Sequence, residues 1–289
     1  MRGGGAAGDN PPMARSNLWG ARLHHVRRDG ADPEKLAQFY GRLLGDRVEA
    51  LGDGTWAVRG RERCLVVGKG QPASVPHFVL VFPDDAQLQA YGRDLDARKL
   101  RRDAFRSPLL EEGAFCVSDP DGRRAVFGVA REGDRPEGMA GRLQHFVCAT
   151  TRLEEMLKFY RDSLGLLESD RVLEGEALAA AFLRSDAEHH SFAAFRAPES
   201  RADHHCYETT GWLDIRDWAD RMGSLGIPLW WGPGRHGPGN NLFFMVEDPD
   251  GHKVEFSAEL EIMPPEMPYR TWPHEERTLN LWGAGWMRS

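Results

Sequence analysis

The sequence predicts an α+β protein built from two copies of one domain. His145 follows His25 by 120 residues, and apolar and glycine positions around the two histidines repeat with the same spacing. A second match pairs residues 115–122 with residues 244–251, and both segments end in Asp-Pro-Asp-Gly. Because this repeat is much longer than a solenoid unit, it indicates a duplicated domain.

Each copy is expected to hold a strand, a helix and further strands, followed by a strand–helix unit and more strands. In the first copy, Asp32 can cap the helix and Gly45 can end it. Gly165 takes the place of Gly45 in the second copy. The later strand–helix units are expected at residues 76–100 and 203–225.

Composition and charge are those of an ordinary globular protein. Of the 289 residues, 41% are hydrophobic and 28% are charged, and the net charge is −7. An acidic chain has no electrostatic reason to bind nucleic acid or an anionic membrane, and no apolar run is long enough to span a bilayer. The four cysteines lack metal-binding spacing and are expected to be buried free thiols, which indicates the cytoplasm.

The repeat divides the chain into five segments. Residues 1–20 lack the apolar core of a signal peptide and are expected to form a flexible tail. Residues 21–130 and 142–260 hold the two copies, joined by the polar, Gly- and Pro-containing linker 131–141. Residues 261–289 are rich in tryptophan. This tail is expected to pack against the domain or a partner subunit, or to close over a pocket as a lid.

The hairpin at residues 242–259 carries a carboxylate in need of a partner. Glu255 alternates with apolar neighbours in a strand, and burying its charge alone would be costly. The second copy also places His145 and the pair His204 and His205 at the starts of strands. Two imidazoles and one carboxylate can form a facial triad, which suits Fe(II) chemistry with O₂.

The first copy lacks the carboxylate. His25 and His77 take the places of the two histidines, but Val126 stands where Glu255 stands in the second copy. Two histidines without a carboxylate are a poor Fe(II) site. The first copy is therefore expected to be degenerate, without metal, and to serve as a scaffold.

Residues 23–259 resemble a two-domain type I extradiol ring-cleavage dioxygenase of the vicinal oxygen chelate (glyoxalase/bleomycin resistance) superfamily. The resemblance implies two tandem modules of paired βαβββ units. It also implies Fe(II), or Mn(II), bound by His145, His205 and Glu255, with O₂ as cosubstrate and a small aromatic diol as substrate. His205 is favoured over His204 because it precedes its strand as His145 does.

The resemblance assigns further roles in the second copy. His190, the second residue of a His-His pair, matches the family's acid–base histidine. His236, in a Gly- and Pro-rich loop, matches a histidine that hydrogen-bonds the bound catecholate. Met245 stands where the family has a tyrosine, and a thioether donates no proton. The expected substrate-binding residues are Trp230, Asn241, Met245 and Arg277.

Two other functions remain open. One is a glyoxalase-like isomerase or lyase of the same superfamily, whose sites are often shared between modules, whereas this one is complete in the second module. The other is a ligand-sequestering protein of the resistance type, which needs neither a metal triad nor His190. The protein is also expected to form a homo-oligomer.

Overall fold

The computed structural model describes residues 16–131, 133 and 137–287. The first module consists of two strand–helix–three-strand units. The first unit contains β1 (Arg22–Gly30), α1 (Pro33–Leu44), β2 (Arg47–Gly52), β3 (Thr55–Arg59) and β4 (Cys64–Lys69). The second unit contains β5 (Ser74–Phe82), α2 (Asp85–Ala97), β6 (Asp103–Ala104), β7 (Phe115–Ser118) and β8 (Arg124–Val129).

The second module repeats this plan. Its first unit contains β9 (Arg142–Thr150), α3 (Leu153–Lys158), the π-helical turn η1 (Phe159–Leu164), β10 (Leu167–Glu174), β11 (Ala177–Arg184) and β12 (Phe192–Arg196). Its second unit contains β13 (Arg201–Thr209), α4 (Trp212–Ser224), β14 (Trp231–Arg235), β15 (Leu242–Glu247) and β16 (Lys253–Ala258). The tail adds β17 (Arg270–Pro273) and α5 (Glu276–Leu279). The predicted α+β fold of paired βαβββ units is confirmed.

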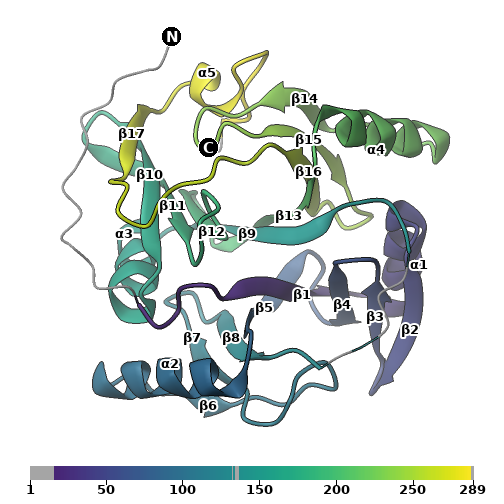
Figure 1. The fold of residues 1–289 in the computed structure, drawn as a ribbon. Helices are drawn as coiled ribbons and strands as arrows, with labels where there is room; N and C mark the ends of the chain where they lie inside the picture. The colour runs from purple at the N-terminus through teal and green to yellow at the C-terminus, as the bar shows by residue number, and fades with distance from the viewer. Residues whose placement is uncertain (1–15, 132, 134–136, 288–289) are drawn as a thin grey trace.

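Each module forms one mixed sheet. The strand order is β2-β3-β4-β1-β5-β8-β7-β6 in the first and β14-β15-β16-β13-β9-β12-β11-β10-β17 in the second. Figure 1 shows the two sheets facing each other, with the four longer helices on the outside. No helix within the described residues has both the length and the apolar character that a membrane crossing requires.

The first helix of each module ends at the glycine predicted from the sequence. In α1, Asp32 Oδ1 accepts a hydrogen bond from the Lys35 amide at 3.2 Å, and Gly45 takes a left-handed φ of 71°. The matching helix of the second module ends at Gly165 with φ 88°. A left-handed residue at this place favours glycine, because a Cβ would clash there.

The two Asp-Pro-Asp-Gly turns join the modules reciprocally. Tyr40 of the first module donates a hydrogen bond to Asp248 Oδ2 of the second at 2.8 Å, and Tyr160 of the second donates to Asp119 Oδ2 of the first at 3.0 Å. Arg28, fully buried, also reaches Asp248, with its Nη2 2.8 Å from Oδ2. Each module's first helix is therefore tied to the last hairpin of the other.

The chain ends differ in part from the prediction. Leu18 is fully buried, and the Gly20 amide donates to the Ser185 carbonyl at 2.8 Å, so residues 16–20 pack against the second module. The prediction of a flexible tail is wrong for these five residues, because an apolar side chain among them enters the core. Residues 1–15, and residues 132 and 134–136 of the predicted linker, lie outside the described part of the chain.

Candidate metal centre and active site

Three neighbouring strands bring the triad together. In the antiparallel pair of β9 and β13, His145 lies opposite Cys206, and in the parallel pair of β13 and β16, Cys206 lies beside Glu255. Paired residues share a face of the sheet, and so do residues two apart on one strand. His204 therefore points to the same side as His145 and Glu255.

The distances agree with this register. The Glu255 Oε2 atom lies 3.1 Å from His204 Nε2 and 3.5 Å from His145 Nε2. All three side chains are buried. The Cys206 thiol also lies within 4.8 Å of the His145 and Glu255 ligand atoms. We assign the triad to His145, His204 and Glu255, because these three line the adjacent cavity and Cys206 does not.

The predicted ligand His205 faces the other way, so this prediction is wrong. His205 lies opposite Phe146, and its Nδ1 is 2.9 Å from His252 Nε2 in the interface between the modules. The error came from matching the starts of two strands by their neighbouring residues. The pairing register, which has a bulge at Asp203, decides the face instead, because adjacent residues of a strand point to opposite sides.

Both triad histidines are oriented by a second hydrogen bond. His145 Nδ1 lies 2.5 Å from Gln144 Oε1, and His204 Nδ1 lies 2.6 Å from Asp203 Oδ1. Since these oxygens are acceptors, each accepts the Nδ1 proton in a hydrogen bond, and in the neutral form of either ring Nε2 then carries a lone pair that a metal can use. The buried His145 Nε2 atom has no hydrogen-bond partner. Such an arrangement is typical of imidazoles that bind a metal, so the residues fit Fe(II) or Mn(II).

The electrostatics also favour a cation at this point. Burial opposes ionisation of Glu255, but the surrounding imidazoles outweigh it and hold the pKa of this carboxyl well below its usual range. Burial lowers the pKa of His145 and, more strongly, that of His190. At His204, burial is outweighed by Asp203 and Glu255, which raise the pKa of the imidazole. The carboxylates of Asp203 and Glu255 thus stabilise positive charge at His204 and in the space between the three side chains.

A small cavity adjoins the triad. Its volume is about 30 Å³, which is roughly the space of one water molecule. Besides the triad, it is lined by two polar imidazoles, those of His190 and His236, and by mostly apolar side chains. These are Val147, Phe182, Phe195, Trp231, Pro238, Met245, Thr278 and Leu279.

His236 is held beside Glu255 by the C-terminal tail. Its Nδ1 lies 2.6 Å from the Leu279 carbonyl, and its ring stacks on Phe243 at 3.7 Å between centroids. The carbonyl accepts the Nδ1 proton, so Nε2, which is 3.6 Å from Glu255 Oε1, is a free acceptor. Met245 lines the same cavity. The structure thus brings both residues to the cavity beside Glu255.

His190 lies on the opposite side of the cavity, with its ring centroid 4.2 Å from that of His145. Its Nδ1 is 3.0 Å from His189 Nδ1, and His189 Nε2 is 2.8 Å from Asp170 Oδ2. All three side chains are buried. The His-His pair predicted from the sequence thus has a carboxylate behind it that the sequence did not indicate.

Three of the four predicted substrate-binding residues lie elsewhere. Trp230 is 37% exposed and packs on Trp286, while its neighbour Trp231 lines the cavity. Asn241 is buried and donates to Glu255 Oε1 at 3.3 Å, so it helps to orient this carboxylate. Arg277 is exposed on α5. These three predictions are corrected, because none of the three side chains is among those that line the cavity.

The C-terminal tail does form part of the cavity wall, through Thr278 and Leu279. The strand β17 that precedes these residues pairs with β10 at the edge of the sheet. Apolar and aromatic wall residues from β9, β11 and β12 were missed by sequence reasoning. Their strand periodicity is the same as that of ordinary core residues.

The matching position in the first module is filled. His25 and His77 approach each other, with ring centroids 6.2 Å apart. Val79, Cys116 and Val126 pack there in one buried apolar cluster. By strand register these three occupy the places of Cys206, Met245 and Glu255. With no carboxylate among these described residues, they do not fit a metal.

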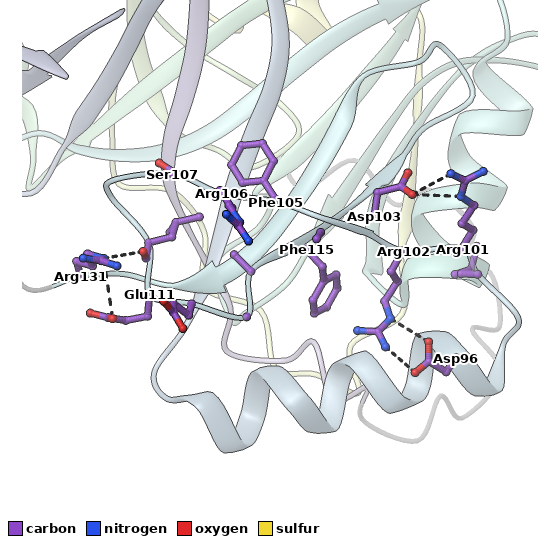
Figure 2. Close-up of a pocket in the computed structure, with 16 residues that line it drawn as sticks. Asp96, Arg101, Arg102, Asp103, Phe105, Arg106, Ser107, Glu111, Phe115 and Arg131 are labelled. Carbon is purple, nitrogen blue, oxygen red and sulfur yellow. Dashed lines mark hydrogen bonds and ion pairs between the residues drawn. The ribbon is translucent and has the colours of Figure 1, made fainter. Parts of the chain in front are cut away.

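A much larger pocket, of about 820 Å³, lies beside the short edge strand β6 of the first module. Figure 2 shows that its charged side chains bond mostly to one another. Arg102 contacts Asp96 at 2.6 Å, and Arg101 contacts Asp103 at 3.0 Å. No histidine or cysteine lines this pocket. We therefore place the active site at the small cavity beside the triad.

Comparison with known proteins finds a family model that matches the second module. Residues 142–256 match the model of the Glyoxalase/Bleomycin resistance protein/Dioxygenase superfamily. Metapyrocatechase 2 of Cupriavidus necator is 32% identical over 182 residues, which are 62% of this chain and 53% of that protein. The chain therefore matches only about half the length of this relative.

Solved structures match almost the whole chain. Homoprotocatechuate 2,3-dioxygenase of Arthrobacter globiformis superposes with a TM-score of 0.80 at 23% identity, covering 96% of this chain and 91% of that one. The Mn(II)-bound glyoxalase of Novosphingobium aromaticivorans gives a TM-score of 0.77 at 22% identity, covering 92% of each chain. The second module thus matches the model of the Glyoxalase/Bleomycin resistance protein/Dioxygenase superfamily, and the whole chain has the two-module fold seen in homoprotocatechuate 2,3-dioxygenase.

Proposed function

We propose that this protein is a metal-dependent extradiol dioxygenase that uses O₂ to open the ring of an uncharged catechol. The observation that carries the proposal is the set His145, His204 and Glu255, whose ligand atoms converge beside a cavity that His190 and His236 also line. A two-histidine, one-carboxylate set leaves coordination positions open for substrate and O₂. The first module, without a carboxylate, serves as a scaffold.

The chemistry that Fe(II) or Mn(II) supplies at such a triad is to hold diol and O₂ on one centre and to lower the pKa of the diol hydroxyls. The free Nε2 of His236 can accept a hydroxyl proton, and this supplies the function for which Met245 is unsuited. His190, on the opposite side, is placed to exchange a proton with the oxygen side of the reaction. The apolar wall excludes water.

The lining of the cavity favours an uncharged substrate. Among the described residues that line it, none is Lys or Arg, and the only acid is Glu255. A carboxylate on the substrate would be buried without a partner, which is unfavourable. Phe182, Phe195 and Trp231 instead offer aromatic and apolar surface to an alkyl or aryl substituent.

The test is anaerobic loading with Fe(II), followed by O₂ uptake and absorbance with catechol, 3-methylcatechol and 3,4-dihydroxyphenylacetate. We expect ring cleavage of the uncharged diols, with kcat/KM lower for the carboxylated one by on the order of tenfold or more, since 1.4 kcal/mol is tenfold. A fully loaded protein that takes up no O₂ with any diol would exclude the dioxygenase. Turnover of a glutathione hemithioacetal would favour the glyoxalase-like alternative. Tight binding of a diol without turnover would favour a ligand-sequestering protein.

We also infer a cytoplasmic homo-oligomer that acts on a free small molecule. The four cysteines are buried free thiols, which suits a reducing compartment. Trp212 and Trp282 are 46% and 53% exposed and contact each other at 6.0 Å between centroids, next to exposed Leu213. Such an apolar surface is typical of subunit contacts. Light scattering after gel filtration measures the mass, and a monomer at micromolar concentration would contradict the inference.

A further inference from the structure

A buried hydrogen-bonded row of side chains runs from the active-site cavity to the C-terminal tail. His190 Nδ1 contacts His189 Nδ1 at 3.0 Å, and His189 Nε2 contacts Asp170 Oδ2 at 2.8 Å. Arg270 of β17 then donates through Nε to Asp170 Oδ1 at 2.8 Å and through Nη2 to Asp170 Oδ2 at 3.1 Å. The same guanidinium holds Glu261.

The order of donors along this row is determined at its charged end. Burial opposes ionisation of Asp170, but the hydrogen bonds from His189 and Arg270 outweigh it and lower the pKa of this carboxyl. An ionised carboxylate only accepts, so His189 must carry its proton on Nε2. His189 Nδ1 is then an acceptor, and His190 must donate to it from Nδ1. The Nε2 atom of His190 is left with a lone pair for the cavity.

The backbone of His190 is fixed as well. Gln144 Nε2 donates to the His190 carbonyl at 2.6 Å, and the same residue accepts from the ligand His145 through Oε1. The ring of His190 also packs edge-on against Phe182, at 5.2 Å between centroids. The position of the ring therefore has several supports, whereas its proton arrangement depends on His189 and Asp170.

The first module has no counterpart of this row. Its only histidines are His24, His25 and His77, so no histidine occurs in the segment that matches His189 and His190. The duplicated fold thus holds its shape without these side chains. The row occurs only in the module that carries the triad. We therefore connect the row with the reaction and not with the stability of the fold.

On the basis of the proposed dioxygenase function, we propose that Asp170 and His189 are positioning residues that fix the tautomer of His190. They hold its Nε2 unprotonated and facing the cavity, ready to accept a proton or hydrogen bond from the reacting groups. Arg270 connects this hydrogen-bonded row to the C-terminal tail, whose Thr278 and Leu279 form part of the cavity wall. Docking of the tail therefore both shuts the site and orients its acid–base histidine.

The decisive variant is Asp170→Asn, which keeps the shape but can donate from Nδ2 to His189 Nε2. This reverses the row, so that His189 donates to His190 Nδ1 and the proton of His190 moves to Nε2. We expect kcat for catechol to fall by about 10²-fold, the lower range for a lost acid–base group, with metal content and the anaerobic Kd for catechol unchanged. Long-range ¹⁵N NMR of the full-length Zn(II)-loaded protein should show the His190 proton moving from Nδ1 to Nε2.

Two further changes separate orientation from stability. Glu168→Gln is the matched control, because Glu168 is an equally buried carboxylate on the same strand that bonds Arg171 instead of a histidine. It should leave kcat and the His190 tautomer as in the wild type. His189→Gln offers a carbonyl acceptor to His190 Nδ1 and should retain the tautomer and most of kcat. His189→Phe, which cannot accept, should lose both.

The outcomes are distinguishable from a failure of the proposed function. If no diol is cleaved, the NMR comparison still reports whether Asp170 and His189 fix the tautomer. A His190 proton on the same nitrogen in wild type and Asp170→Asn would overturn the inference. So would an Asp170→Asn enzyme with kcat within about threefold of the wild type, since a lost acid–base group costs far more.

Discussion

Alanine in place of Glu255 or His204 is expected to reduce the metal retained after Fe(II) loading from near-stoichiometric to background. Either change removes one of three ligands, and Glu255→Ala also removes the carboxylate that compensates a buried cation. Ring cleavage should fall below detection in both variants. Metal is measured by mass spectrometry after anaerobic desalting, and circular dichroism checks that the fold remains.

The fold itself supplies the controls. Val126→Ala alters the position in the first module that matches Glu255, and it should bind metal as the wild type does. His205→Phe tests the choice between the adjacent histidines, because Phe78 holds the matching place in the first module. It should also retain the metal. Equal iron content in Glu255→Ala and Val126→Ala would refute the assignment of the active module, and loss of iron in His205→Phe alone would restore His205 as the ligand.

Asp248→Asn is expected to destabilise the protein by about 3–5 kcal/mol, the usual cost of removing one partner of a buried ion pair. Asp248 is buried and accepts through Oδ2 from both Arg28 and Tyr40 of the other module, at 2.9 and 2.8 Å. Asparagine would remove the buried countercharge of the fully buried guanidinium and leave it only the partly exposed carboxylate of Asp250, at 3.0 Å. It still offers Oδ1 to the backbone amides of the turn, so the effect measured is that of the intermodule contact.

The comparison uses thermal and denaturant unfolding of variants at both ends of the interface. Asp119→Asn, which affects the reciprocal contact of Tyr160, should also destabilise strongly. Asp103→Asn, at the exposed pair with Arg101, should change stability by less than about 0.5 kcal/mol. An Asp248→Asn protein as stable as the Asp103→Asn protein would show that the two turns do not hold the modules together.

Much of the fold could be predicted because duplication made local signals repeat. The cap at Asp32, the glycines at 45 and 165 and the two Asp-Pro-Asp-Gly turns are set by residues near one another in sequence. Each has a backbone requirement that few residue types meet. The same comparison of copies showed that the first copy has Val126 at the position where the second copy has the carboxylate Glu255. What the repeat could not give is the reciprocal contact of Tyr40 and Asp248, which are 208 residues apart.

At the site, comparison of the two copies could not decide which of two adjacent residues faces the cavity. His204 and His205 are identical in type and adjacent, so only strand register separates a ligand from an interface residue. Val79 pairs with Val126 in the first module as Cys206 pairs with Glu255 in the second. An alignment of His77-Phe78-Val79 with His204-His205-Cys206 that respects these pairs matches His77 to His204 and not to His205. The same choice between adjacent residues arises at Trp230 and Trp231. A shift of one residue along a strand moves a side chain to the opposite face of the sheet. The bulge at Asp203 adds such a shift, which the sequence does not reveal.

By itself, the sequence predicted the duplicated α+β fold and singled out four residues that the structure brings together around one cavity: His145, Glu255, His190 and His236. These follow from residue types and spacings that repeat or stand out. Only the tertiary structure decided between His204 and His205, placed Trp231 at the cavity, and put Asp170 and Arg270 behind His190. Such choices depend on pairing between strands distant in sequence, because a side chain's direction is set by its partner strand and not by its neighbours along the chain.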